Sequence, residues 1–271
     1  MSRYRELTEH LQSLADIRAI LAGMRTLAAV ELQRVTRLQD AGMALRQGLE
    51  ATVAAYYANR APPAHETGMC VLLGSEKGLC GDFNERLLAA VASGTGPLVL
   101  VGSKLAASAS DRPGVVARCV GALATDDVGP VLAGLAQTLA ELNAASGWLE
   151  VLCHDPQQHI IRRLVVLPPP TGSAVRLAPR LQLPALQFET ALLEHYLFAV
   201  FNGLLLDSLL AENQQRIAHL QAALQRLDER CEELRLHQRR ARQEEFIEEV
   251  EVALSVSGAL QAPGEHREAG D

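Results

Sequence analysis

The residues best placed to do chemistry lie in one glycine-rich segment, residues 75–84, with the sequence SEKGLCGDFN. It follows a short apolar run and precedes a stretch of helical spacing, and the backbone N–H groups of such a turn can bind phosphate. It does not match the P-loop pattern, because Lys77 precedes Gly78 and no Ser or Thr follows, and it does not match G-x-G-x-x-G. The pattern therefore favours a structural strand-to-helix turn over a nucleotide site.

Two other groups could take part in catalysis. Cys80 lies in the same turn, where a helix N-terminus would favour a thiolate, but no base is nearby in sequence, so a small packed cysteine is the better interpretation. His154 and Asp155 follow a predicted strand, and without a further His or Glu at catalytic spacing we interpret them as a solvent-exposed loop pair. We therefore predict no catalytic residue, no cofactor and no metal site.

Composition narrows the class of protein. The 271 residues are 48% hydrophobic and 21% charged, which is enough for a substantial core. Aromatic residues are only 4%, as expected for helices packed through Leu and Ala. The net charge of −7 argues against a surface that neutralises nucleic-acid phosphates, so nucleic acid is not an expected partner. Arg supplies nearly all the positive charge and suits fixed ion pairs at protein interfaces.

The cysteines and the N-terminus indicate the compartment. The five cysteines are scattered, odd in number and without metal-ligand spacing, which fits a reduced cytosolic environment. Residues 1–14 interrupt their apolar positions with charges, unlike a signal peptide, and no apolar run approaches the roughly 20 residues of a membrane span. We therefore expect no direct membrane insertion, and any membrane association should come through other subunits.

Proline placement predicts two long helices. No proline precedes Pro62, and none lies between Pro184 and Pro263. In the first stretch apolar residues recur every seven positions: Leu7, Leu14, Leu21, Ala28 and Val35. In the last stretch they alternate spacings of three and four: Ile217, Leu220, Leu224, Leu227, Cys231 and Leu234. Both patterns are typical of a coiled-coil seam.

The two helices are expected to pair with each other. A helix over residues 189–260 would be on the order of 100 Å long and needs a partner along its length. The helix over residues 1–60 is the candidate within the chain, and it covers only part of the longer one. We therefore predict an antiparallel pair, with the remainder facing another protein or protruding.

The middle of the chain has a different pattern. Short apolar runs read as strands at residues 69–73, 98–101, 115–120, 149–153 and 160–167, and helical spacing appears at 82–92 and 126–144. Alternating strands and helices predict a small Rossmann-like α/β domain at residues 68–170 with a mostly parallel sheet. A proline-rich connector at 171–188 and a polar tail at 261–271 complete the division.

A charged stretch near the C-terminus has two interpretations. From Arg226 to Glu245 the apolar seam ends in polar residues, with Arg239, Arg242 and Gln243 among several glutamates. The stretch is either a solvated helix face supported by ion pairs four residues apart, or a surface that contacts a partner. Periodicity alone does not decide between them.

Three separated blocks resemble the gamma subunits of ATP synthases. The turn SEKGLCGDFN is similar to that family's signature Ser-Asp-Arg-Gly-Leu-Cys-Gly-Gly-x-Asn, sharing Gly78, Leu79, Cys80, Gly81 and Asn84. Residues 20–35 resemble its first helix. Residues 211–255 align without a gap on its last helix, with matches at Glu212, Arg216, Glu233, Leu234, Ala241, Arg242, Gln243 and Glu249. Arg239, Ile247 and Glu31 depart from the usual Asn, Thr and Lys, which suggests a divergent branch, such as an alternative bacterial ATPase.

The resemblance implies a role as a non-catalytic central shaft. In that family the coiled coil lies inside a ring of alpha and beta subunits, and the α/β domain sits with the epsilon subunit on the membrane rotor ring. It also implies that Arg242 and Gln243, with Arg239 beside them, contact the beta subunits, and that Met24 and Arg25 lie near the same region of the opposed helix. The implied location is the cytoplasmic face of the bacterial plasma membrane.

Two other classes remain open. The chain could be a small α/β enzyme with helical arms for dimerisation, or a coiled-coil adaptor unrelated to ATP synthesis. Bound nucleotide on the isolated chain would support the enzyme, whereas co-purification with ATP synthase alpha and beta subunits would separate all three classes.

Overall fold

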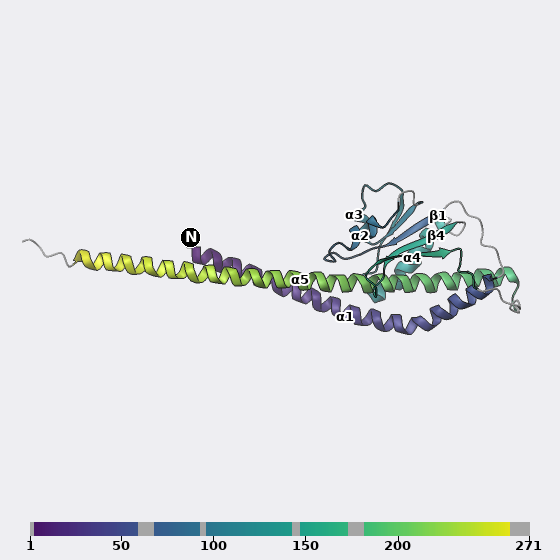
Figure 1. Cartoon of the computed structure of the whole chain (residues 1–271), viewed down its shortest axis with the longest axis horizontal. Helices are drawn as coiled ribbons and strands as arrows, with labels where there is room; N and C mark the ends of the chain where they lie inside the picture. The colour runs from purple at the N-terminus through teal and green to yellow at the C-terminus, as the bar shows by residue number, and fades with distance from the viewer. Residues whose placement is uncertain (1–2, 59–67, 93–95, 143–146, 173–181, 261–271) are drawn as a thin grey trace, which may run out of the picture. The chain divides into compact units, whose positions relative to one another are not determined.

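Two long helices run through the chain, α1 (Arg3–Tyr57) and α5 (Ala185–Leu260) (Figure 1). The computed structural model describes residues 3–58, 68–92, 96–142, 147–172 and 182–260, with side chains to residue 254. It divides into two compact units. Unit 1 comprises Met1–Gly23 with Ala222–Asp271, and unit 2 comprises Met24–Gln221, so each long helix contributes to both.

Unit 1 is an antiparallel helix pair. The Gln238 amide of α5 donates to the Thr8 hydroxyl of α1 at 2.7 Å, and Arg18 donates to Asp228 at 2.6 Å, so one helix ascends in sequence as the other descends. The α5 residues buried in this unit are Leu224, Cys231, Leu234 and Ala241. Their spacings of seven and three are those of a coiled-coil seam, so the predicted antiparallel pairing is confirmed.

Unit 2 is built on one sheet. In the described part of the chain its strands are β1 (Gly68–Leu73), β2 (Leu98–Val101), β3 (Val115–Cys119), β4 (Trp148–His154) and β5 (Ile161–Leu167). The order is β3-β2-β1-β4-β5, and all neighbours are parallel except β4 and β5. The predicted strands and the mostly parallel sheet are confirmed, to within one residue at each strand end.

Helices cover both faces of the sheet. Helices α2 (Phe83–Ala89) and α3 (Ser103–Ser108) pack on one face, through Leu87 and Leu105. Helix α4 (Val128–Glu141) and the first part of α5 pack on the other, and α1 joins the same core through Val35 and Val53. The sheet thus has a separate apolar cluster on each face, and the two long helices share the cluster that α4 also joins.

Some expected boundaries need correction. Helix α5 begins at Ala185, inside the expected connector 171–188, because the Pro184 carbonyl accepts the first helical bond from the Phe188 N–H at 3.0 Å. Helix α3 and a short 3₁₀ helix, η1 (Thr125–Asp127), were not predicted. Residues 173–181 of the connector and the tail 261–271 lie outside the described residues. The domain boundaries otherwise stay predictions.

Helix α5 also bears on the question of membrane spans. By length and composition alone, its part from Ala185 to Leu254 qualifies as long and apolar enough to cross a membrane, which corrects the expectation that no such run exists. In the qualifying window 56% of the residues are buried inside the molecule. The apolar composition of this segment is therefore explained by its packing against the sheet and α1.

Candidate functional site

The glycine-rich turn follows β1 at the carboxyl end of the parallel strands. Leu79 and Gly81 both have φ of 62°, so the chain reverses sharply before α2. Asn84 closes the turn from inside: its Oδ1 accepts from the Ser75 N–H at 3.0 Å, and its Nδ2 donates to the Ser75 hydroxyl at 2.8 Å. Both residues are buried. The signature asparagine therefore fixes the start of the turn.

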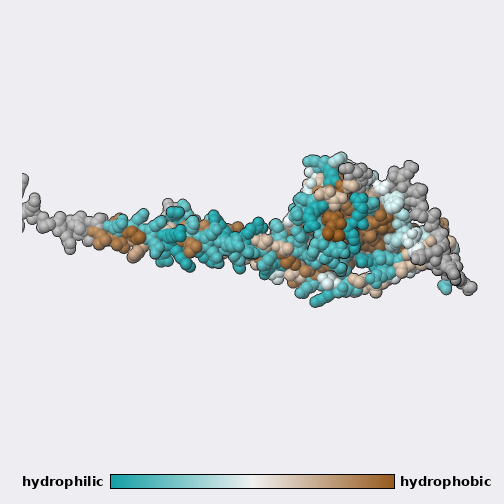
Figure 2. All heavy atoms as spheres, viewed as in Figure 1, coloured by the Kyte–Doolittle hydropathy of each residue, from teal (hydrophilic) through white to brown (hydrophobic). Residues whose placement is uncertain are grey.

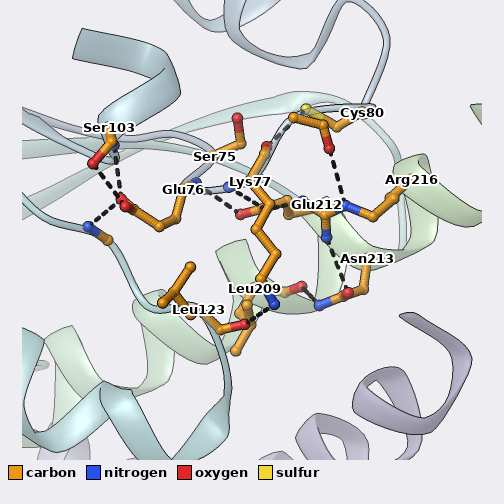
Figure 3. Close-up of polar contacts among 12 residues, drawn as sticks. Ser75, Glu76, Lys77, Cys80, Ser103, Leu123, Leu209, Glu212, Asn213 and Arg216 are labelled. Carbon is orange, nitrogen blue, oxygen red and sulfur yellow. Dashed lines mark hydrogen bonds and ion pairs between the residues drawn. The ribbon is translucent and has the colours of Figure 1, made fainter. Parts of the chain in front are cut away.

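A carboxylate from α5 occupies the concave side of this turn. The Glu212 carboxylate accepts hydrogen bonds from the backbone N–H groups of Glu76 at 3.3 Å and Lys77 at 3.2 Å (Figure 3). Arg216, one helical turn later, donates to Glu212 and to the Gly78 carbonyl, the latter at 3.1 Å. Glu212 is 3% exposed and Arg216 4%, so the whole contact is desolvated. The Glu212 carboxylate of α5 thus occupies the position on the turn that a bound anion would take.

The turn is tied to the neighbouring loops as well. The Glu76 carboxylate accepts from the N–H and the hydroxyl of Ser103 and from the N–H of Gly121, each at 2.7 Å. The Lys77 ammonium donates to the Leu123 carbonyl at 2.7 Å. Three loops that follow parallel strands are therefore held together by side chains of the turn (Figure 3).

The pKa shifts of Glu212 and Cys80 are those expected where the turn and α5 are packed together away from water. Burial raises the pKa of the Glu212 carboxyl, and the Arg216 guanidinium and the two N–H groups oppose that rise. Burial likewise raises the pKa of the Cys80 thiol, whose Sγ lies 3.7 Å from the Lys77 carbonyl oxygen. A thiol held in its neutral form is a poor nucleophile, as expected for a packed cysteine.

The pair His154 and Asp155 differs from its expected setting. His154 is 4% exposed, its ring stacks on Phe83 with centroids 3.7 Å apart, and its Nε2 lies 2.8 Å from the Phe83 carbonyl oxygen. Asp155 accepts from the N–H groups of Gln157 and Gln158. The interpretation of both as a solvent-exposed loop pair was wrong for His154, because β4 extends through it and carries its ring into the core.

The residues implied to contact a partner are divided between the units. Arg239, Arg242 and Gln243 are exposed on α5 in unit 1, where the Arg242 guanidinium lies 5.8 Å from the centre of the Tyr4 ring. Met24 and Arg25 are half-buried in unit 2, where Arg25 donates to Gln221. These two groups are described within separate units, and the partner contacts that the resemblance implies for them stay a prediction.

Sequence reasoning missed the role of four charged residues. Glu212 and Arg216 appeared only as matches in the last helix, Glu31 only as a departure and Glu76 only as part of the turn. Each makes a specific contact in unit 2. The detectable signal was a carboxylate and an arginine four residues apart on the apolar face of a predicted helix. Among the described residues no group of three or more His, Cys, Asp or Glu could hold a metal ion.

Comparisons with known proteins cover nearly the whole chain. The ATP-synt family, described as ATP synthase, matches residues 3–259. No curated protein sequence matches significantly. Among solved structures, a chain of the Euglena gracilis mitochondrial ATP synthase, in its OSCP/F1/c-ring assembly in rotational state 3, is 15% identical with a TM-score of 0.67, over 98% of this chain and 99% of that one.

Two further structures show the same fold. A chain of the rotor of the Euglena gracilis enzyme in rotational state 1 is 14% identical with a TM-score of 0.65, over 90% of this chain and 98% of that one. A chain of the Tetrahymena thermophila mitochondrial ATP synthase, central stalk and c-ring, is 17% identical with a TM-score of 0.58, over 75% and 99%. Since the family match spans both long helices and the sheet, this chain belongs to the ATP synthase gamma-subunit family.

Proposed function

We propose that this chain is the central rotor shaft of a rotary ATP synthase, which couples ion flow across a membrane to ATP synthesis or hydrolysis in separate catalytic subunits. The observation that carries the proposal is the family match over residues 3–259, which includes both helices of the shaft and the sheet between them. The similar solved chains belong to rotor, central-stalk and F1/c-ring assemblies.

The shaft itself is proposed to be non-catalytic. The glycine-rich turn, the best candidate for a phosphate site, already holds the Glu212 carboxylate on its N–H groups. Cys80 and His154 are buried, and each lies against a backbone carbonyl oxygen, that of Lys77 and that of Phe83. What supports a mechanical role is that side chains of α5 and α1 bind the α/β domain within unit 2, so that torque on that domain is passed to the helices.

Unit 1 carries the surface proposed to act on the catalytic subunits. Its α5 segment exposes Arg239, Arg242 and Gln243, and its last described turns expose the apolar residues Val250, Val252 and Leu254 (Figure 2). A shaft that makes different contacts with each of three surrounding subunits stabilises a different conformation in each, and rotation moves those conformations around the ring. Met24 and Arg25 are proposed as further contacts on α1.

The proposed partners are the alpha and beta subunits around the coiled coil, and the epsilon subunit and membrane rotor ring near the α/β domain. The chain is then a peripheral part of a membrane-bound complex. We place that complex at the cytoplasmic face of a bacterial plasma membrane, in keeping with five cysteines that are all free.

Affinity purification of the tagged chain from its native host tests the proposal. Co-elution of alpha and beta subunits with nucleotide-dependent ATPase activity is the expected result, with no activity in the chain alone. Micromolar Mg-ATP binding by the isolated chain would instead favour the small α/β enzyme. A stable complex that lacks alpha and beta subunits would favour an adaptor.

A further inference from the structure

We propose that the glycine-rich turn is a carboxylate-binding site whose resident ligand is the Glu212 side chain, and that it will accept a free small carboxylate once that side chain is removed. This inference concerns unit 2 alone and does not depend on the rotor role. It explains the feature that the sequence left open, a phosphate-type turn with no phosphate-binding motif.

The donor set is that of an anion site. Two successive backbone N–H groups, from Glu76 and Lys77, point at the carboxylate, and the Arg216 guanidinium completes the set (Figure 3). Successive N–H groups of a turn form a concave anion site, and a guanidinium adds a charge-assisted bond. Glu212 and Arg216 are both more than nine-tenths buried, so the interaction is shielded from water and salt.

The donors are held in place independently of Glu212. Arg216 also donates from Nε to the Gly78 carbonyl and from Nη1 to the Asn213 side chain, each at 3.1 Å. The turn is fixed by Asn84 on Ser75 and by Glu76 on Ser103 and Gly121. Removal of the Glu212 carboxylate therefore leaves an organised, positively charged pocket instead of a collapsed one.

The location in the sheet fits a ligand site. The turn follows β1, which lies between β2 and β4, and in parallel α/β sheets ligands bind beyond the carboxyl ends of the strands where the chain order reverses. Here α5 covers that crevice, with the Ser208 hydroxyl donating to the Leu73 carbonyl at 3.2 Å. Only about 10 Å³ of free space remains beside Glu212, about one water-sized sphere, so no free anion can enter the intact protein.

The size of the pocket predicts its ligand. The substitution Glu212→Ala removes a methylene and a carboxylate, which is the volume and charge of acetate. Formate lacks the carbon that fills the methylene space, and propionate carries one carbon more than the crevice has room for. Acetamide has the shape of acetate without its charge. The expected order of binding is acetate, then formate, then propionate, with none for acetamide.

Thermal unfolding of the full chain tests this order. Wild type, Glu212→Ala and the control Leu204→Ala, a buried truncation on the same helix that exposes no donor, are melted in each additive at matched ionic strength. We expect Glu212→Ala to lower Tm by roughly 10 °C, because the buried Arg216 loses its partner. Millimolar acetate should restore at least about a third of that loss in a saturable manner, as a bound ligand does. Acetate should not raise the Tm of either other protein above the chloride value.

Three results would overturn the proposal. They are an unchanged Tm in Glu212→Ala, equal effects of acetate and chloride, or equal effects of acetate and acetamide. If Glu212→Ala does not fold in buffer, the same comparison is made on refolding yield, where recovery in acetate alone supports the site and equal recovery in chloride rejects it. Glu212→Gln provides a second check, because its amide fills the pocket and acetate should then have no effect.

Discussion

The Glu31 carboxylate on α1 accepts a 2.6 Å hydrogen bond from the backbone N–H of Thr125, the first residue of η1. This contact binds the N-terminal long helix directly to the α/β domain within unit 2. Lysine, common at this position in the gamma subunits that the sequence resembles, has no acceptor and cannot make it. The departure at Glu31 is therefore a specific tie between two elements and not a neutral surface change.

Introducing lysine at position 31 should remove the hydrogen bond between α1 and η1. We expect Glu31→Lys to lower the free energy of unfolding by about 1.5 to 3 kcal/mol, the usual range for a hydrogen bond to a charged group. Urea titration of the full chain measures it. Glu31→Gln keeps an acceptor oxygen and should lose less, and Glu9→Gln, an exposed carboxylate on the same helix, should cost under about 0.5 kcal/mol. Equal stability of Glu31→Lys and wild type would contradict the tie.

A second tie joins α1 to α5 where Arg46 crosses Gly203. A Cβ at Gly203 would lie 2.5 Å from Arg46 Nη1, and the same guanidinium lies 3.8 Å from the buried Asp207. We expect Gly203→Ala to gain about 0.5 to 1 kcal/mol of helix propensity in an Arg46→Ala background, and to gain less or nothing when Arg46 is present. A double-mutant cycle by urea unfolding measures the difference. Additive changes in the free energy of unfolding would show that the Arg46 side chain does not pack against Gly203.

Protonation of His154 should destabilise unit 2. Burial lowers the pKa of the His154 ring, so the folded chain binds fewer protons than the unfolded chain. The stability that this group supports is fully present above its ordinary pKa of about 6.5 and is lost as pH falls below it toward the lowered value. Urea midpoints between pH 7.5 and pH 5 should fall more steeply for wild type than for His154→Phe. Parallel curves would refute the assignment.

Leu79 holds strain that asparagine should release. It adopts a φ of 62° while 41% exposed, and a left-handed conformation costs a residue with a branched side chain about 1 to 2 kcal/mol. Asparagine tolerates that conformation, so Leu79→Asn should raise the free energy of unfolding by up to about 1 kcal/mol. His159→Asn is a matched test at the other non-glycine residue of positive φ in the described chain. A loss of stability in Leu79→Asn would mean that its apolar contacts outweigh the strain.

The exposed pair Arg242 and Gln243 should affect turnover and not folding. Its one described ring contact is Arg242 over Tyr4, worth about 0.5 to 1 kcal/mol, so the double change to Ala should leave Tm of the isolated chain nearly unchanged. In the assembled complex the ATPase rate or its coupling should fall several-fold, because the charge-assisted bonds proposed between these residues and a beta subunit would be lost. Arg235→Ala, at another exposed arginine of α5 in unit 1, is the control. A wild-type rate in the double variant would contradict the proposed contact, and Arg239 would be the next residue to replace.

Repeated patterns made much of the fold predictable. The seven-residue repeat of α1 and the three-four repeat of α5 predicted which helix positions face the interior. Of those positions Ala28, Val35, Leu220, Leu224, Cys231 and Leu234 are buried, and the others are half-buried. Short apolar runs located the strands because parallel strands covered on both faces are apolar throughout. Helix α3 was missed because six residues after Gly102, with φ of 120°, carry too little periodicity to be recognised.

The joint at the glycine-rich turn was not predictable in the same way. Glu212 and Arg216 are local neighbours on α5, but the N–H groups that bind Glu212 come from residues 135 and 136 positions earlier in the chain. Almost every residue type carries the same backbone N–H group, so the sequence of the turn does not indicate which carboxylate its N–H groups bind. Only the three-dimensional arrangement shows that α5 fills the turn.

The separation of paired residues within unit 1 has a consequence for synthesis of the chain. Thr8 and its partner Gln238 are 230 residues apart, and at about 5 to 20 residues per second the ribosome needs roughly 10 to 50 s to make the second after the first. Throughout that interval the apolar positions of the first turns of α1, in unit 1, have no partner helix on their own chain, although Val35 and Val53 further along α1 can already pack on the sheet. The N-terminal end of the first helix made is therefore among the last parts of the chain to be buried.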